Sequence, residues 1–128
     1  MHPPVLSDRG LDAAISGLAA LSPVPVTVRA SLPDRPAASA EAIAYFVVAE
    51  ALTNVAKHAR ATQADVVISR HGDVLRVVIR DDGIGGADPH GEGLAGLADR
   101  LAGVDGQLSV RSPAGGPTVI EAELPCGS

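Results

Sequence analysis

Hydrophobic residues recur at helical spacing in three stretches of the chain. The first stretch covers residues 6–21. The second, from about 39 to 59, is rich in alanine, lacks glycine and proline, and has Ser39 in position to cap its N-terminus. The third covers about 93–102 and is followed by Gly103, which is typical of a helix end. The pattern therefore predicts three helices, of which the second is the longest.

Alternating apolar and polar residues predict five short strands, over 24–29, 64–70, 74–80, 107–112 and 118–124. Prolines flank and interrupt the first one, which favours an edge strand because proline donates no backbone N–H. The second and third are joined by a tight turn at 71–73. The order of elements predicts an α/β fold, a two-layer sandwich with about three helices on one face of a mixed, mostly antiparallel sheet.

The composition excludes several classes of protein. Fifteen acidic and ten basic residues give a net charge of -5, and the arginines are spread from Arg9 to Arg111, which argues against a duplex DNA binder. Tyr45 and Phe46 are the two aromatic residues, so a row of stacking rings for single-stranded nucleic acid is absent. A single cysteine, Cys126, excludes an internal disulfide and a cysteine-rich zinc site. We expect one domain over 1–128, without a signal peptide or a membrane span, in a cytoplasmic compartment.

Polar residues follow one face of the long predicted helix. Glu50, Asn54 and His58 are spaced by four residues, and Lys57, the one lysine of the chain, follows Asn54 by three. An ordinary solvated helix face would have the same spacing. A carboxylate beside an amide oxygen also suits a hard cation, so a second signal elsewhere in the sequence has to decide between the two interpretations.

Glycines supply that second signal. A predicted strand runs directly into Asp81-Asp82-Gly83-Ile84-Gly85-Gly86, where glycine lets the backbone approach a ligand and a carboxylate accepts a donor. A simple turn is the alternative, because Asp-Gly is common in turns. Gly91, Gly93 and Gly96 then lead into a helix, where free N–H groups favour phosphate, although neither a Walker A loop nor a dinucleotide fingerprint is present. A metal cluster of Asp82, Asp88, His90 and Glu92 is disfavoured, since these residues lack regular ligand spacing.

Taken in order, these motifs resemble the ATP-binding domain of the gyrase, chaperone, histidine-kinase and mismatch-repair (GHKL) superfamily, known as the Bergerat fold. The segments "EALTNVAKHA", "DDGIGG" and "GEGLAGLADRL" look like the histidine-kinase branch associated with NarL-type response regulators. The resemblance covers nearly the whole chain. It departs from the family pattern at Gly115-Gly116-Pro117-Thr118, where a proline interrupts the usual Gly-Gly-Thr.

The resemblance implies a role for each matching residue. Asn54 would ligate Mg²⁺ through its side-chain oxygen, and Glu50 would lie beside the water shell of the metal or accept a proton. Lys57 and His58 would meet the phosphates of ATP. Asp81 would accept the adenine amino proton, and the glycines at 83 and 85 would make room for the ring. The lid over the triphosphate would comprise Gly91, Gly93 and Leu94, and Thr118 would back the adenine.

A histidine kinase also needs a phosphoacceptor histidine followed by an acidic residue, and the four histidines here are followed by proline, alanine or glycine. The resemblance thus implies a catalytic domain whose acceptor lies on a dimerisation module outside this chain, with residues 1–22 just after that module. The fragment would be a monomer on the cytoplasmic side. Its parent would be a dimer, with any membrane anchor in segments outside this chain, that passes phosphate to a NarL-type response regulator. An anti-sigma-factor serine kinase and a non-catalytic nucleotide-binding module of the same fold are the alternatives.

Overall fold

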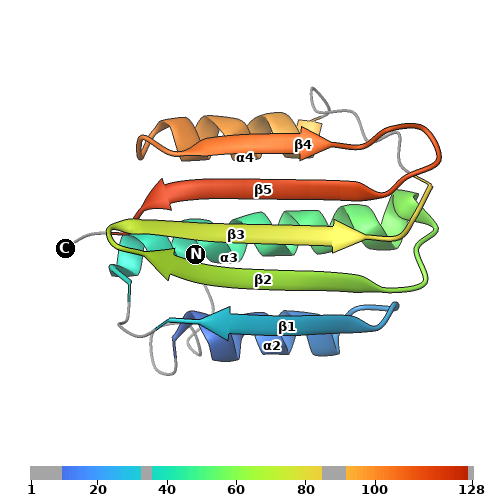
Figure 1. The fold of residues 1–128 in the computed structure, drawn as a ribbon, viewed down its shortest axis with the longest axis horizontal. Helices are drawn as coiled ribbons and strands as arrows, with labels where there is room; N and C mark the ends of the chain where they lie inside the picture. Colours follow the sequence, from blue (N-terminus) through green and yellow to red (C-terminus); the bar gives the residue numbers. More distant parts are fainter. Residues whose placement is uncertain (1–9, 33–35, 85–91, 127–128) are drawn as a thin grey trace.

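A computed structural model describes residues 10–32, 36–84 and 92–126 of the chain. Its elements are α2 (Leu11–Ala20), β1 (Val26–Ser31), α3 (Ala38–Asn54), the π-helix η1 (Val55–Ala59), β2 (Ala64–His71), β3 (Val74–Asp81), α4 (Glu92–Ala102), β4 (Gln107–Arg111) and β5 (Thr118–Pro125). The strands form one sheet in the order β1-β2-β3-β5-β4 (Figure 1). Only the β1–β2 pair is parallel among these neighbours, so the predicted mixed, mostly antiparallel sheet is confirmed.

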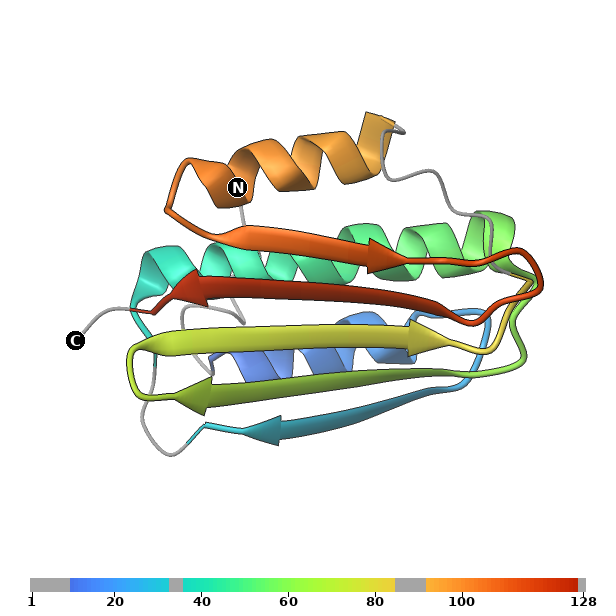
Figure 2. The ribbon, with the colours of Figure 1, turned by 45° about the horizontal axis from the view of Figure 1, so that its top comes forward.

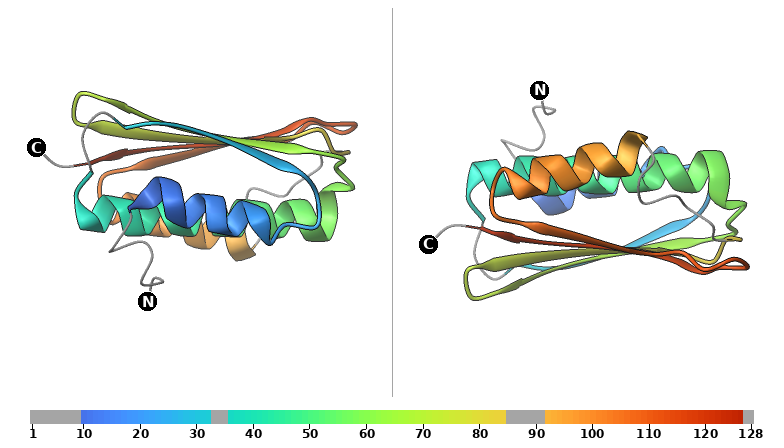
Figure 3. Two further views of the ribbon diagram at one scale, coloured as in Figure 1. Left: turned by 90° about the horizontal axis from the view of Figure 1, so that it is seen from below. Right: turned by 90° about the horizontal axis from the view of Figure 1, so that it is seen from above.

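The helices form a second layer on one face of the sheet, which confirms the predicted two-layer α/β sandwich. Figure 2 shows α3 running along the middle of the sheet, between α2 and α4. Edge-on views show all three helices on the same side, with the opposite face of the sheet left open (Figure 3). The side chains of β2, β3 and β5 alternate accordingly: most of those that point toward the helices are buried, and those on the open face are exposed or half-buried.

The core lies between the sheet and α3. On the helix, Ala44, Val47, Val48 and Ala51 are buried, and they pack over apolar residues from the inner faces of the strands. Those strand residues include Val66, Ile68, Leu75, Val77, Ile79 and Ile120. The small alanine side chains let a long helix lie close to the sheet, which explains why the stretch with the highest alanine content crosses the centre of the fold.

The first strand begins and ends two residues later than the predicted 24–29. Pro25 has no N–H to donate, and its carbonyl accepts the N–H of Ala64 at 3.0 Å, just before the parallel register begins at Val26. The preceding residue is held in a turn, because the Val24 N–H donates to Ser22 Oγ. The prediction of an edge strand is confirmed, since β1 lies at the end of the sheet.

The N-terminus of α3 is fixed by the backbone, and the prediction that Ser39 caps it is wrong. The helix begins at Ala38, and Ala37 is the capping residue without a side-chain hydrogen bond. The Ala37 N–H instead donates to the carbonyl of Cys126 at 2.9 Å, and the Cys126 N–H donates to Asp73. A contact with a residue almost ninety positions away therefore sets where this helix starts.

The C-terminal end of the long helix also differs from the prediction. Regular α-helix ends at Asn54, and Val55–Ala59 continue as a π-helix that stops at Arg60, a residue in the left-handed region with φ of 50°. A π-helix turns less per residue than an α-helix, because its hydrogen bonds reach five residues instead of four. Lys57, three residues past Asn54, is therefore turned further from Asn54 than it would be in a regular α-helix.

Candidate functional site

Several elements that are distant in the sequence meet at one end of the sheet. This end holds the last residue of β3, the first residue of β5, the turn between β4 and β5, and the C-terminal end of α3 with η1 (Figure 1). The predicted site residues that the structure describes belong to these elements, to the segment just after β3 or to the first turn of α4. This end of the sheet is the candidate site.

Asp81 is the buried charge of the candidate site, with 5% of its surface exposed. Its side chain points toward the helical layer, and the backbone N–H of Gly83 donates to its Oδ1 at 2.8 Å. Burial raises the pKa of the Asp81 carboxyl, the Gly83 hydrogen bond opposes that rise, and the neighbouring Asp82 adds to it. Oδ2 makes no hydrogen bond to another described residue, so it is the oxygen that a ligand would meet.

Thr118 lies directly opposite Asp81. The two residues are partners in the antiparallel register of β3 and β5, and Thr118 is also buried. Its Oγ1 lies 2.6 Å from the hydroxyl of Ser112, which orients the threonine side chain from the end of β4. A buried carboxylate and a buried hydroxyl thus share one small region of the inner face of the sheet.

The turn between β4 and β5 supports this region from the side. The Gly115 N–H donates to the carbonyl of Ile84 at 2.7 Å, which ties the turn to the segment that follows β3. Gly115 has φ of 90° and Gly116 has φ of 78°, a conformation that favours glycine. Pro117 therefore interrupts the family motif without moving Thr118 away from Asp81, since the strand starts at Thr118 itself.

The helix supplies a second group of polar residues. Glu50 and Asn54 are half-buried in the last turns of α3, whereas Lys57 is exposed on η1. The side chain of His58 lies outside the described part of the structure. The predicted helix group is thus brought to the same end of the molecule as Asp81, with Lys57 turned relative to Asn54 by the π geometry.

The predicted glycine loop is described only at its two ends. Gly83 is buried beside Asp81, and α4 begins at Glu92, so Gly93 lies in its first turn. Leu94 is 3% exposed and belongs to the core, so it anchors this turn of α4 against the rest of the domain. Gly85 and Gly91 lie outside the described residues.

Asp82 has a role that the sequence did not reveal. Its carboxylate accepts hydrogen bonds from the Thr62 N–H at 2.7 Å, from the Gln63 N–H at 3.1 Å, and from the Thr62 hydroxyl. These bonds lower the pKa of Asp82, with the Thr62 hydroxyl as the largest cause. Thr62 and Gln63 precede Asp82 by 20 and 19 positions, which explains why no local sequence pattern indicates these bonds.

The described residues contain no group of three or more His, Cys, Asp or Glu side chains that could hold a metal ion, and Asp88 and His90 lie outside them.

Residues 40–128 match the family described as histidine kinase-, DNA gyrase B- and HSP90-like ATPases. The chain belongs to this ATPase family. The match spans α3 through β5 and so includes both the Asp81–Thr118 pair and the polar end of the helix. The expected superfamily and its fold are confirmed.

Sensor histidine kinases are among the relatives of this ATPase domain. Sensor histidine kinase YvfT of Bacillus subtilis is 41% identical over 78 residues, which cover 59% of this chain and 20% of the relative. Sensor histidine kinase NarS of Mycobacterium tuberculosis is 36% identical over 112 residues, covering 82% of this chain and 26% of the relative. The chain thus spans about a fifth to a quarter of the length of these kinases.

Solved structures of histidine kinases share the fold of this ATPase domain. The blue-light activated histidine kinase EL346 of Erythrobacter litoralis matches with a TM-score of 0.71 and 25% identity, over 92% of this chain and 41% of that one. The histidine kinase AdeS of Acinetobacter baumannii matches with a TM-score of 0.67 at 11% identity, over 94% of this chain and 64% of that one. In the described part of this chain, no helix has the length and apolar character to cross a membrane.

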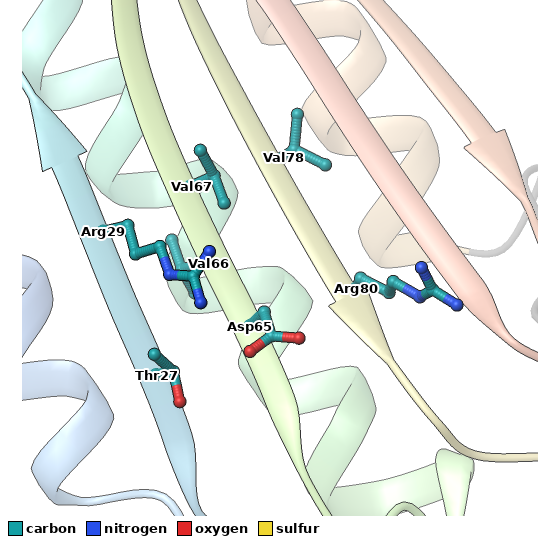
Figure 4. Close-up of a pocket in the computed structure, with 7 residues that line it drawn as sticks. All are labelled: Thr27, Arg29, Asp65, Val66, Val67, Val78 and Arg80. Atoms are coloured by element: carbon teal, nitrogen blue, oxygen red, sulfur yellow. The ribbon is translucent and has the colours of Figure 1, made fainter.

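The open face of the sheet carries a shallow hollow that is separate from the candidate site. Figure 4 shows its lining, which comes from β1, β2 and β3. The side chains are Thr27, Arg29, Asp65, Val66, Val67, Val78 and Arg80. None of the predicted site residues lies there, so the ATPase motifs assemble on the helical side of the sheet and not in this hollow.

Proposed function

We propose that this ATPase domain is the ATP-binding catalytic domain of a sensor histidine kinase. It binds Mg-ATP and delivers the γ-phosphate to a histidine on a dimerisation module outside this chain, for onward transfer to a NarL-type response regulator. The observation that carries the proposal is the buried Asp81 carboxylate, at the same end of the sheet as the polar end of α3, with one oxygen fixed by Gly83 and the other unbonded among the described residues.

The Asp81 end of the site suits adenine. The buried Asp81 carboxylate, whose Oδ2 accepts no hydrogen bond from another described residue, can accept one from an exocyclic amino group. Such a bond discriminates well because an unpaired buried carboxylate is costly. The Thr118 hydroxyl, oriented by Ser112, provides a second polar group on the same side of the ring. Gly83 leaves room for the ring because it has no side chain. We assign the same role to Gly85.

The helix end suits the phosphates. Glu50 and Asn54 present carboxylate and amide oxygens from half-buried positions, and these are the ligand types that Mg²⁺ prefers. In the proposed site Asn54 would bind the metal through its side-chain oxygen, and Glu50 would act next to it, through water or as a proton acceptor. Bound Mg²⁺ would neutralise charge on the phosphate oxygens. Lys57, exposed on η1, adds a positive charge that can reach a phosphate, and we assign the same role to His58.

The N-terminal turn of α4 completes the site. Backbone N–H groups at a helix N-terminus attract phosphate, and Leu94 anchors this turn in the core. We assign Gly91, Gly93 and Leu94 to the lid over the triphosphate. Catalysis in the parent kinase is then mainly the positioning of the γ-phosphate for in-line attack by the acceptor histidine.

The relatives support a larger parent protein. This chain matches about a fifth to a quarter of YvfT and NarS, so a sensor histidine kinase has room for input and dimerisation segments beyond the ATPase domain. We propose that residues 1–128 act as a single catalytic domain, with residues 1–22 adjoining the dimerisation module. The domain is a monomer on the cytoplasmic side, and its parent acts as a dimer without direct contact to nucleic acid.

Calorimetric titration of Mg-ATP into the domain tests this function. We expect saturable binding, weakened about 10-fold or more in Asp81→Asn, because a hydrogen bond to a charged group contributes about 1.5–3 kcal/mol. Asn54→Ala should remove most of the dependence of affinity on Mg²⁺. Asp65→Asn, which changes an exposed aspartate on the open face, is the matched control and should bind as the wild type does. Failure of the folded wild-type domain to bind Mg-ATP would refute the proposal.

A further inference from the structure

We infer that Asp82 is a positioning residue for nucleotide binding, because its carboxylate holds the connector 60–63 and thereby keeps Asn54 and Lys57 aligned with Asp81. The inference rests on the proposed function. It assigns a role in that function to a residue that contacts neither the base nor the phosphates in the proposed site. Its basis is the set of hydrogen bonds between the two segments that carry the site.

The segment between the helix and β2 has few buried anchors. Val55 is 4% exposed, and the next buried side chain described along the chain is Ala64. Between them Ala56, Lys57 and Arg60 are exposed. Among the side chains that the structure describes, apolar packing therefore ends at Val55 and resumes at Ala64.

Hydrogen bonds to Asp82 take over where packing stops. Its Oδ1 accepts the N–H groups of both Thr62 and Gln63, and its Oδ2 accepts the Thr62 hydroxyl. In return, the Asp82 N–H donates to the Gln63 carbonyl at 3.3 Å. Asp82 is exposed, so the function of these bonds is to fix geometry and not to satisfy a buried charge.

The same contact joins the connector to the base side of the site. Asp82 directly follows Asp81, and Ala64 pairs with Asp81 in the register of β2 and β3. Only Arg60 to Gln63 lie between the end of η1 and this paired residue. A connector this short transmits a shift at Thr62 to the helix end, so loss of the Asp82 bonds should change the distance between the phosphate-binding residues and Asp81.

The test compares two ligands. Mg-ATP uses both halves of the proposed site, whereas adenosine uses only the Asp81 half. In Asp82→Ala we expect the affinity for Mg-ATP to fall about 10-fold, which corresponds to roughly 1.4 kcal/mol of binding free energy. The affinity for adenosine should change less than about 2-fold. Asp82→Asn keeps an oxygen for the two N–H groups and should restore most of the loss. Asp65→Ala is the matched control and should leave both affinities unchanged.

A second measurement monitors the contact without a nucleotide. Amide hydrogen exchange at Thr62 and Gln63 should accelerate in Asp82→Ala and stay slow in Asp65→Ala, since only the former removes the acceptor. Thr62→Val keeps the backbone bonds and removes the hydroxyl bond. Thr62→Val should therefore lose less Mg-ATP affinity than Asp82→Ala. If Asp82→Ala does not fold, the Mg-ATP affinities of Thr62→Val and Asp82→Asn test the inference in its place.

Two results would overturn the inference while leaving the proposed function intact. One is an unchanged affinity for Mg-ATP in a folded Asp82→Ala. The other is an equal loss of affinity for Mg-ATP and adenosine, which would place the effect on the Asp81 half alone. Absence of Mg-ATP binding by the wild-type domain would instead remove both the proposed function and the inference.

Discussion

Asp81 and Asp82 are neighbours in the chain, but their environments shift the pKa values of their carboxyl groups in opposite directions. Burial raises the pKa of Asp81, which points into the helical layer, and hydrogen bonds from Thr62 and Gln63 lower the pKa of Asp82. The shifts differ because successive side chains at the end of β3 point to opposite sides of the sheet. One carboxylate is therefore buried at a cost in stability and is the ligand-binding one in the proposed site, whereas the other holds the connector 60–63.

Asp81→Asn should make the domain more stable while it impairs nucleotide binding. The amide keeps an oxygen for the Gly83 N–H and removes a desolvated charge, so we expect the free energy of unfolding near pH 7 to rise by up to about 1 kcal/mol, or about 4 °C in Tm. Thermal unfolding followed by circular dichroism measures this change. A lower Tm would mean that the carboxylate is stabilised by its surroundings and would contradict our account of Asp81.

Below about pH 7, the two aspartates should contribute oppositely to the pH dependence of the free energy of unfolding. A raised folded-state pKa makes the Asp81 contribution most favourable below the unfolded pKa near 4, and that contribution is lost as pH rises through the folded value. The lowered pKa of Asp82 gives stability that is present above about pH 4 and is lost as pH falls through the folded value.

Relative to the wild type, the loss of stability on acidification should therefore be smaller in Asp82→Asn and larger in Asp81→Asn. Urea unfolding at several pH values between about 3 and 7 measures both slopes. Asp65→Asn serves as the reference variant. A parallel change in the two variants would refute the opposite assignment of the two carboxyl groups.

Gly106→Ala should destabilise the connection between α4 and β4. A methyl group there would lie 2.9 Å from the Glu123 carbonyl oxygen and 3.0 Å from Leu101 Cδ2. The backbone must shift to relieve this, and the Gly106 N–H already donates to the Leu101 carbonyl, so we expect a loss of about 1–3 kcal/mol.

Gly17→Ala provides the opposite control for the same measurement. Gly17 lies in α2, and a Cβ at this position has nothing within 4 Å. Alanine is the better helix former, so this variant should gain about 0.5–1 kcal/mol. Equal effects of the two substitutions in denaturant unfolding would contradict the packing seen at Gly106.

Arg100 and Phe46 connect α4 to α3 through a cation–π contact. The guanidinium carbon lies 4.5 Å from the centre of the phenyl ring. A double-mutant cycle with Arg100→Ala and Phe46→Leu should give a coupling energy of about 0.5–1 kcal/mol, because Arg100 is exposed and Phe46 is only half-buried. A coupling near zero would show that the ring and the guanidinium contribute separately.

The sequence predicted the type and order of the elements, since hydrophobic periodicity is a local property. It located Asp81 and Thr118 by their motifs, and the register of β3 and β5 places them opposite each other. It missed features that depend on distant residues. The start of α3 depends on the carbonyl of Cys126, and the role of Asp82 depends on Thr62.

The π-helix at Val55–Ala59 could not be read from periodicity either. Five residues with alanine, valine and lysine suit an α-helix equally well, so propensity does not separate the two forms. Because the connector to β2 is short and held by Asp82, the position of the strand constrains how the helix ends. Tertiary contacts, and not local preference, favour the wider turn.

Cys126 offers a use that follows from its position. It is the one cysteine in the sequence, it is 1% exposed, and its backbone joins the end of β5 to the start of α3. From Thr118 the strand carries the chain about 25 Å away, at roughly 3.3 Å per residue. The rate at which a thiol reagent labels Cys126 would therefore report how often the end of the sheet remote from Asp81 opens to solvent, without an engineered probe. A ligand that binds at Asp81 and slows this labelling must therefore stabilise the domain beyond its own site.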